Sequence, residues 1–455
     1  MAMSLARALA AFVLLTGCLA ILSPGSGPCS QLGPCACDGY GRVVCSCTQE
    51  NQAVTINPEG VPSTTTRIEV SGCDRVSFAA GALSHLRELR HISVLGAAHL
   101  SLGEEAWHWA ALDPGAYTPG LKIQVSDSHV PDIPSHAISG RIDSIVFNSS
   151  TIDNIRPFAF SKLVGLKSIE FTNCTIVNVE TQAFKKFPVE SFVIKGTRFR
   201  TLPSRTISDL EIRKILRIDD ISAESIRSSA FLLSGSRNFH LENSRIETIE
   251  GDAFRVVAAG PVFIKNNVIQ HLNAGAFAGF TVPGQLTALS GPMELHFDNN
   301  TVTSFQQGSL RINQSSYSLV LKDLKLNILC ECSLGAGGAF LQDERSVLCA
   351  LESPFGPDRV TYKYVYLYEE EMCSNKGYRW AIIAIVSVCS LIVVLAVVLA
   401  MVFIVKKSNR HGFSWINRLK GENSKVSVIL PDGKTYRETE LHVIVERADL
   451  LTTDL

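Results

Sequence analysis

The sequence predicts an α/β-type repeat solenoid, a curved stack of short units whose strands line up in one parallel, concave sheet. The prediction rests on an apolar pattern that recurs along the middle of the 455-residue chain, on cysteines gathered at both ends of that pattern, and on one long apolar run after it. The formal net charge of −1 offers no basic stripe for a nucleic acid, so no nucleic-acid partner is expected.

The repeat is an arrangement of apolar residues at fixed distances from an origin. Around Phe171, apolar residues stand two positions before it and five, eight and thirteen after it, at Ile169, Ile176, Val179 and Phe184. Eleven origins, strict and loose together, follow this pattern: Val70, Val94, Val125, Phe147, Phe171, Ile194, Ile218, Leu241, Ile264, Phe297 and Leu321. Successive origins are 22 to 24 residues apart except for spacings of 31 and 33, whose insertions at 109–119 and 281–292 are expected to be surface loops.

This pattern dictates how a unit folds. Two apolar residues separated by one position form a short strand whose alternate side chains point inward. The three later apolar positions fold the rest of the unit back over the same core. One unit cannot bury this face alone, whereas stacking buries it continuously, so 67–329 is predicted to hold about eleven repeats.

Two further features carry a resemblance to a known family. An Ala-Phe pair lies near the end of five units, at 159–160, 183–184, 230–231, 253–254 and 276–277. A small polar residue or a cysteine stands three after the origin at Cys73, Ser128, Ser150, Cys174, Thr197, Ser244, Asn267 and Asn300. The pattern resembles the extracellular leucine-rich-repeat, single-pass transmembrane family over 28–373, although Ala97, Ile221 and Leu324 depart from it. The resemblance implies a leucine-rich-repeat horseshoe in which the polar side chain bonds the turn backbone, and it implies receptor or adhesion roles.

The cysteines at the two ends resemble the family's caps at 28–66 and 330–379. The resemblance implies bridges Cys29–Cys37 and Cys35–Cys45 in the first cap, and Cys330–Cys349 and Cys332–Cys373 in the second. Cys47 is then left over, and we expect it to pair with Cys73, which occupies the inward polar position next to the cap. A zinc site built on the Cys-Glu-Cys run at 330–332 is the alternative, although 330–373 contains no histidine.

Two apolar runs predict the topology. The run from Ala8 to Ile21 follows Arg7 and precedes small residues, which is typical of a cleaved signal peptide over 1–26; a bacterial lipoprotein box at 15–18 is the alternative. The 26 residues of 380–405 carry no charge and are long enough to span a bilayer, whereas a buried core helix would rarely be so long and so apolar. Lys406, Lys407 and Arg410 follow this run, so a type I protein of the plasma membrane with a cytoplasmic tail at 406–455 is expected.

The predicted exterior carries candidate sugar and partner sites. N-glycosylation acceptors stand at Asn148, Asn173, Asn299 and Asn313, and glycans on the first three would obstruct nearby parts of the concave face. Residues one and three before each origin and one after it should point outward from that face. They include Arg67, Glu69, Lys122, Gln124, Glu170, Val193, Lys195, Ile215, Arg217, His240, Phe263 and Glu294. Most such residues are merely solvated, but apolar Val193, Ile215 and Phe263, with Arg217, suggest that an extracellular or cell-surface protein docks across units six to nine.

The tail is too short for a sizeable enzyme domain, but it holds short motifs. A small hairpin is expected over 425–436. Glu446 with Leu450 and Leu451 matches an acidic dileucine signal for clathrin adaptors, and Thr453 with Leu455 resembles a ligand for PDZ domains. The sequence therefore favours a receptor or adhesion protein with a sorting and anchoring tail; a co-receptor or an endocytic sorting receptor is the alternative. No enzymatic activity and no cofactor are expected.

Overall fold

The computed structural model describes residues 29, 32–49, 52–110, 119–306, 308–332, 344–351 and 360–408. The chain divides into two units between Asn375 and Lys376, and each is described by itself. The predicted signal peptide at 1–26 and the tail motifs at 446–455, like the hairpin at 425–436, lie outside the described residues.

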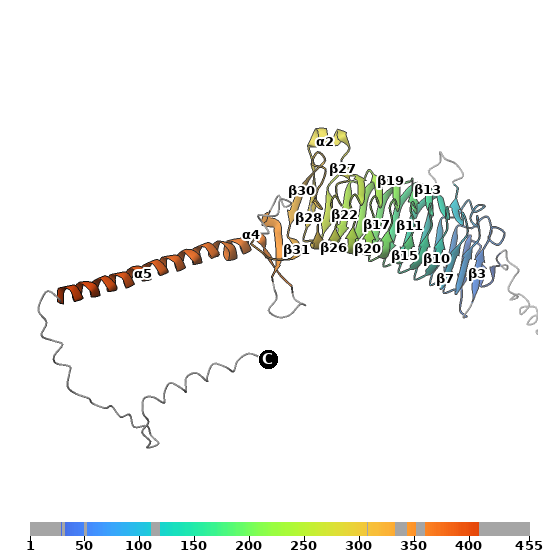
Figure 1. Ribbon diagram of the computed structural model, residues 1–455. Coiled ribbons are helices and arrows are strands. Elements are labelled where there is room, and N and C mark those ends of the chain that lie inside the picture. Colours follow the sequence, from blue (N-terminus) through green and yellow to red (C-terminus); the bar gives the residue numbers. More distant parts are fainter. Residues whose placement is uncertain are drawn as a thin grey trace, which may run out of the picture. The chain divides into compact units, whose positions relative to one another are not determined.

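The first unit is a solenoid whose rungs are hydrogen-bonded in parallel (Figure 1). Its front strands are β2 (Arg42–Ser46), β4 (Arg67–Ser71), β6 (His91–Leu95), β9 (Leu121–Ser126), β11 (Ile138–Asn148), β14 (Leu166–Thr172), β17 (Pro188–Lys195), β19 (Ile207–Asp219), β22 (Asn238–Glu242), β25 (Val262–Lys265), β28 (Met293–Asp298) and β30 (Tyr317–Lys322). Short strands that feed them extend the same 19-stranded sheet: β8 (Trp107–Trp109), β13 (Phe160–Val164), β16 (Phe184–Lys185), β21 (Phe231–Ser234), β24 (Phe254–Val257) and β27 (Phe280–Thr281). We call the outward side of the front strands the front face.

The return half of each unit, which the pattern left undefined, forms a second sheet. Its eleven strands are β10 (His129–Ile133), β12 (Thr151–Ile155), β15 (Thr175–Val179), β18 (Arg198–Leu202), β20 (Ser222–Ile226), β23 (Arg245–Ile249), β26 (Val268–Leu272), β29 (Thr301–Phe305), β31 (Leu324–Leu329), β32 (Val347–Leu351) and β33 (Thr361–Tyr364). Near the N-terminal end, β3 (Ala53–Ile56), β5 (Arg75–Phe78) and β7 (His99–Leu102) form a separate three-stranded sheet. Alternate side chains of these strands are buried, as a half-buried strand requires.

Every unit turns at two corners where the backbone is left-handed. The first corner, two residues after the origin, has φ between 48° and 67° at Gly72, Gly96, Asp127, Ser149, Asn173, Gly196, Asp220, Asn243, Asn266, Asn299 and Asp323. The second, eleven after the origin, runs from Gly81 and Glu105 through His136 to Gly275 and Gly308. All first-corner residues except Ser149 are glycine, asparagine or aspartate, the residues that adopt this conformation at least cost.

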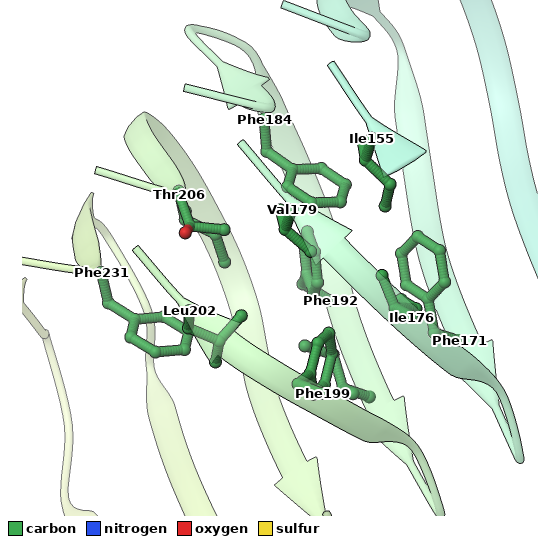
Figure 2. Close-up of a pocket in the computed structure, with 12 residues that line it drawn as sticks. Ile155, Phe171, Ile176, Val179, Phe184, Phe192, Phe199, Leu202, Thr206 and Phe231 are labelled. Atoms are coloured by element: carbon green, nitrogen blue, oxygen red, sulfur yellow. The ribbon is translucent and has the colours of Figure 1, made fainter. Parts of the chain in front are cut away.

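Between the sheets lies a continuous apolar core. Phenylalanines from successive units stack through it: the ring centroids of Phe160 and Phe184 are 4.6 Å apart, and those of Phe231 and Phe254 are 5.2 Å apart. Figure 2 shows how Phe171, Phe184 and neighbouring side chains converge around a void of about 10 Å³ lined almost entirely by apolar groups. A space this small and dry holds no ligand, so the core is structural.

A second, polar line of support runs along the first corner. Asn267 and Asn300 stand three after their origins and are buried. Asn300 Oδ1 accepts from the backbone N–H and the Nδ2 of Asn267, both at 2.9 Å, and Asn300 Nδ2 donates to the Ile264 carbonyl at 2.8 Å. Ser244 has the same role in the preceding unit, where its Oγ accepts from the Ile221 N–H at 3.2 Å. These side chains satisfy buried backbone groups that the corners leave unpaired.

Both ends of the solenoid are covered by disulfide-linked caps. Disulfides join Cys29 to Cys37, Cys35 to Cys45, Cys47 to Cys73, Cys330 to Cys349 and Cys332 to Cys373. Strand β1 (Cys35–Cys37) pairs antiparallel with β2, and β33 pairs antiparallel with β32. Each cap therefore closes a sheet edge that would otherwise offer unpaired backbone groups to another chain.

Helices are few among the described residues. The insertion at 281–292 contains α2 (Gly284–Ser290), so a short helix stands where only a loop was expected; most of the other insertion, 111–118, lies outside the described residues. After β33 come α4 (Val365–Tyr368) and a π-helical turn at Glu369–Cys373. The second unit is dominated by α5 (Ser374–Ser408), in which Trp380–Lys407 has a mean hydropathy of 3.3 and buries none of its apolar stretch. That stretch is long and apolar enough to anchor the chain in a membrane.

Candidate ligand-binding face

The front face is a ladder in which each unit contributes one residue to each row. In the row one position before the origins, the parallel register aligns Val193 with Arg217, Arg217 with His240, His240 with Phe263, and Phe263 with His296. We call these five residues the central row. Strands in a sheet lie about 4.8 Å apart, so the row is about 19 Å long.

Phe263 is held between two histidines in this row. Its ring centroid lies 4.8 Å from that of His240 and 5.1 Å from that of His296, with interplanar angles of 28° and 13°. Because these separations nearly equal the strand spacing, the ladder itself imposes the stack. Lys265, two residues further along β25, places its Nζ 4.8 Å from the centroid of the same ring.

Carboxylates on the neighbouring rows fix the stack and the arginine beside it. Glu242 accepts from His240 Nδ1 at 2.9 Å through one oxygen, and its other oxygen lies 3.1 Å from the Arg217 guanidinium. Glu294 lies 3.0 Å from His296 Nε2. The Glu242 side chain keeps only 16% of its surface exposed, which strengthens these polar contacts relative to freely solvated ones.

The four residues singled out from the sequence do not form one apolar patch. Val193 and Ile215 are near neighbours, since Ile215 pairs with Ser191 and Val193 pairs with Arg217 on the same two strands. Phe263 lies three strands from Val193 along the central row, beyond Arg217 and His240. All four side chains are half-buried rather than fully exposed. Arg217 belongs with the aromatic stack, through Glu242, more than with the aliphatic pair.

His296 was missed in the sequence. It stands one before the origin Phe297, the same phase as His240 and Phe263, but it follows the longer of the two insertions. The insertion leaves the register between β25 and β28 intact, so Phe263 still faces His296. The phase of the repeat was the signal that could have found it.

The predicted glycosylation acceptors occupy the front face and its first corner. Asn148 ends β11 in register with Thr172, whereas Asn173 and Asn299 are left-handed corner residues. The corner backbone alone therefore accounts for asparagine at the last two positions. Asn313 begins a turn in which its Oδ1 accepts from the hydroxyl of Ser315, the third residue of its acceptor motif, at 2.7 Å. Glycosylation at all four remains a prediction.

The face offers platform chemistry rather than reaction chemistry. Among the residues that the structure describes, no three histidine, cysteine, aspartate or glutamate side chains are placed to share a metal ion. A stacked aromatic row with fixed ion pairs has rigid, partly apolar surface that loses little entropy on contact. Such a surface is suited to docking.

Leucine-rich-repeat proteins are among the solved structures to which the chain is similar. This is a leucine-rich-repeat-like β-solenoid. Human 5T4 (Wnt-activated inhibitory factor 1, trophoblast glycoprotein) matches 76% of this chain and 97% of its own at 13% identity, with a TM-score of 0.25. A TLR13–ssRNA13 complex matches 61% of this chain and 58% of its own at 10% identity and a TM-score of 0.17. The Drosophila Toll–Spätzle complex matches 76% and 80% at 11% identity and a TM-score of 0.13.

Likeness at these identities concerns the fold and establishes no shared ligand or activity for the leucine-rich-repeat-like chain. No family model and no curated protein sequence matches it. Its function has to be argued from its own residues.

Proposed function

We propose that the chain is a type I protein of the plasma membrane that binds another protein, extracellular or on a cell surface, through its front face. The disulfide-linked caps support an exterior location, since disulfides persist in oxidising compartments. The apolar helix Trp380–Lys407, followed in the sequence by further basic residues, supports one membrane span with the tail inside. Protease added to intact cells should then cleave within 29–373 and spare 409–455.

The observation that carries the binding proposal is the His240–Phe263–His296 stack on an open sheet face. Aromatic and arginine side chains dominate the affinity of protein interfaces when they are rigid and surrounded by contacts that exclude water. Here the aromatic ring is fixed on both sides, and Arg217 is fixed by Glu242. A partner seated across β19 to β28 would bury the exposed edges of the stack without reorganising it.

The test is to display the full-length chain on cells, to screen it against purified cell-surface ectodomains, and to measure the affinity of any ectodomain that binds. Phe263→Ala should weaken that affinity roughly 30-fold or more, as truncation of a central interface residue typically costs about 2 kcal/mol or more. Arg217→Ala should weaken it in the same direction. Val268→Ala is the matched control, because Val268 is 38% exposed but lies on β26 in the second sheet.

Surface abundance of each variant shows whether it folds. Full affinity of correctly displayed Phe263→Ala and Arg217→Ala variants would exclude this part of the front face as the docking site. Val193→Asp and Ile215→Asp then ask whether the aliphatic neighbours belong to the same interface.

An association with adaptor proteins is the second candidate, and it rests on the dileucine motif at 446–451 and the C-terminal Thr453-Asp454-Leu455. If the chain is an endocytic sorting receptor or a co-receptor, Leu450→Ala with Leu451→Ala should raise its surface abundance. Adding one alanine after Leu455 should abolish capture by a PDZ domain, because the bound carboxylate moves out of its backbone nest. Unchanged abundance and retained capture would refute the two roles separately.

A further inference from the structure

A different chemistry occupies the front face at the N-terminal end. In the row three positions before the origins, Arg42 aligns with Arg67, Arg67 with His91, and His91 with Lys122. We call Arg42, Arg67, His91 and Lys122 the basic row. It crosses the strands β2, β4, β6 and β9, so its ends are about 14 Å apart at the usual strand spacing.

The cations of this row are exposed and only partly neutralised. The side chains of Arg42 and Arg67 keep 48% and 46% of their surface, and Lys122 is exposed. Glu69 contacts both arginines, as an ion pair with Arg67 and at 3.5 Å from Arg42. Asp38 lies 3.9 Å from Arg42, while Lys122 has no ion-pair partner among the described residues. Two acidic groups thus face three permanent cations and a histidine.

The rest of the front face over these strands is polar and lacks aromatic side chains. The other outward residues are Val44, Ser46, Glu69, Ser71, Ser93, Leu95 and Gln124. Hydroxyl and amide groups therefore lie beside a line of cations, with Val44 and Leu95 as the apolar members. Protein interfaces draw their affinity from buried aromatic anchors, which this surface does not offer.

We propose that the basic row binds a linear sulfated polysaccharide, with sulfate groups on the two arginines and Lys122 and sugar hydroxyls on the serines and Gln124. Guanidinium groups bind tetrahedral oxyanions through paired hydrogen bonds, which a line of cations at fixed spacing can repeat along a chain of regularly spaced anions. This site is separate from the central row. It depends on the proposed function only in requiring that the solenoid face the outside of the cell.

His91 gives the site a pH dependence with a defined sign. Burial lowers the pKa of His91, and the neighbouring Arg67 and Lys122 cations lower it further, while Glu69 opposes them. These are the charged groups on the two strands that flank His91, β4 and β9. A bound sulfate would offset the two cations and favour the imidazolium. Binding should therefore tighten as the pH falls from about 7.5 to about 5.5.

The experiment measures binding of a size-defined heparin oligosaccharide to the full-length chain in detergent at two salt concentrations. Arg67→Gln with Lys122→Gln should weaken binding roughly tenfold or more, since hydrogen bonds to charged groups contribute about 1.5–3 kcal/mol each. Arg198→Gln with Arg245→Gln is the matched control, because it removes two exposed arginines from the second sheet. The control should change binding less than twofold, and higher salt should weaken binding to the unaltered chain.

Glu69→Gln keeps the result interpretable if the double variant folds poorly. It removes the carboxylate that competes for Arg42 and Arg67, so it should tighten binding, an effect that damage to the fold cannot produce. His91→Gln should abolish the pH dependence and leave binding at about pH 7.5 nearly unchanged.

Several outcomes would overturn the proposal. Equal losses in the basic-row and second-sheet variants would mean that oligosaccharide binding is non-specific. Equal binding of the oligosaccharide after chemical desulfation, or tighter binding of polyglutamate or single-stranded RNA, would mean that the row recognises another ligand. None of these results would change the behaviour of Phe263→Ala, so the two proposals fail independently.

Discussion

The buried asparagine pair at the first corner makes a prediction whose size can be worked out from the contacts. Asn300→Leu removes the acceptor for two Asn267 donors and the donor to the Ile264 carbonyl. Three unpaired buried groups cost about 3–6 kcal/mol, and the apolar surface that leucine buries returns about 1.5–2 kcal/mol. The net loss of local stability is then about 2–4 kcal/mol. Leucine fits the space, because Leu324 occupies the same position one unit later and is fully buried.

Hydrogen exchange followed by mass spectrometry is the suitable assay, since repeat arrays open locally rather than as one body. Amides of β25, β28 and β30 in the full-length chain should exchange roughly 30-fold to 700-fold faster, while those of β2 and β4 should not change. The substitution keeps the acceptor motif at Asn299 intact. Asn266→Gly is the control: it removes an exposed corner asparagine with φ of 57°, which glycine adopts freely. Unchanged protection in Asn300→Leu would refute the view that corner hydrogen bonds hold adjacent units together.

Other predictions follow from single positions. Phe254→Ala should destabilise its units by about 3–5 kcal/mol, measured by the same exchange assay, because the ring is completely buried between neighbouring rings; a loss under about 1 kcal/mol would contradict this. Gly260→Ala should abolish surface display, since an added Cβ would lie 1.7 Å from the Arg237 carbonyl oxygen, and normal display would show that this corner can open. Because the folded-state pKa of His91 is lowered, stability should fall as the pH drops below its unfolded value and level off below the folded one; His91→Gln should remove that part of the acid sensitivity in thermal melts at about pH 7 and 5.

The core of the solenoid could be predicted because its determinants are local and periodic. The apolar positions around Phe171 at −2, 0, +5, +8 and +13 are all buried. The same phase predicted that Val193, Arg217 and Phe263 point away from the core. A pattern of side-chain burial defines which residues face inward, but it does not say whether the return segment is helical or extended, and here it is a second parallel sheet.

The left-handed corners were overlooked although their signal was present. Glycine, asparagine or aspartate stands two after almost every origin, as at Gly196, Asp220 and Asn243. These residues are also common in loops and, for asparagine, in glycosylation motifs, so their periodicity was hidden by their ordinary uses. Aligning the units by origin and reading the polar columns, not only the apolar ones, would have revealed the corner.

The candidate site was harder to predict than the fold because it depends on contacts between units. Outward phase alone placed His240 and Phe263 on the front face, but stacking requires that adjacent units be in register across an insertion of unknown path. Likewise, only the geometry reveals that one carboxylate, Glu242, holds both Arg217 and His240. Side-chain partners within a row can be read from the sequence once the register is known.

The ladder explains how one face can carry two unrelated chemistries. Each unit supplies a single residue to a row, and the corners and core that fix the register are made by other residues of the same unit. A substitution on the face therefore changes one position in a row without moving its neighbours, as the alternation of Val193, Arg217 and His240 illustrates. Charges gathered over β2 to β9 and rings gathered over β22 to β28 are then independent sites. Variants in one should leave ligand binding at the other unchanged, which is the condition on which both experiments depend.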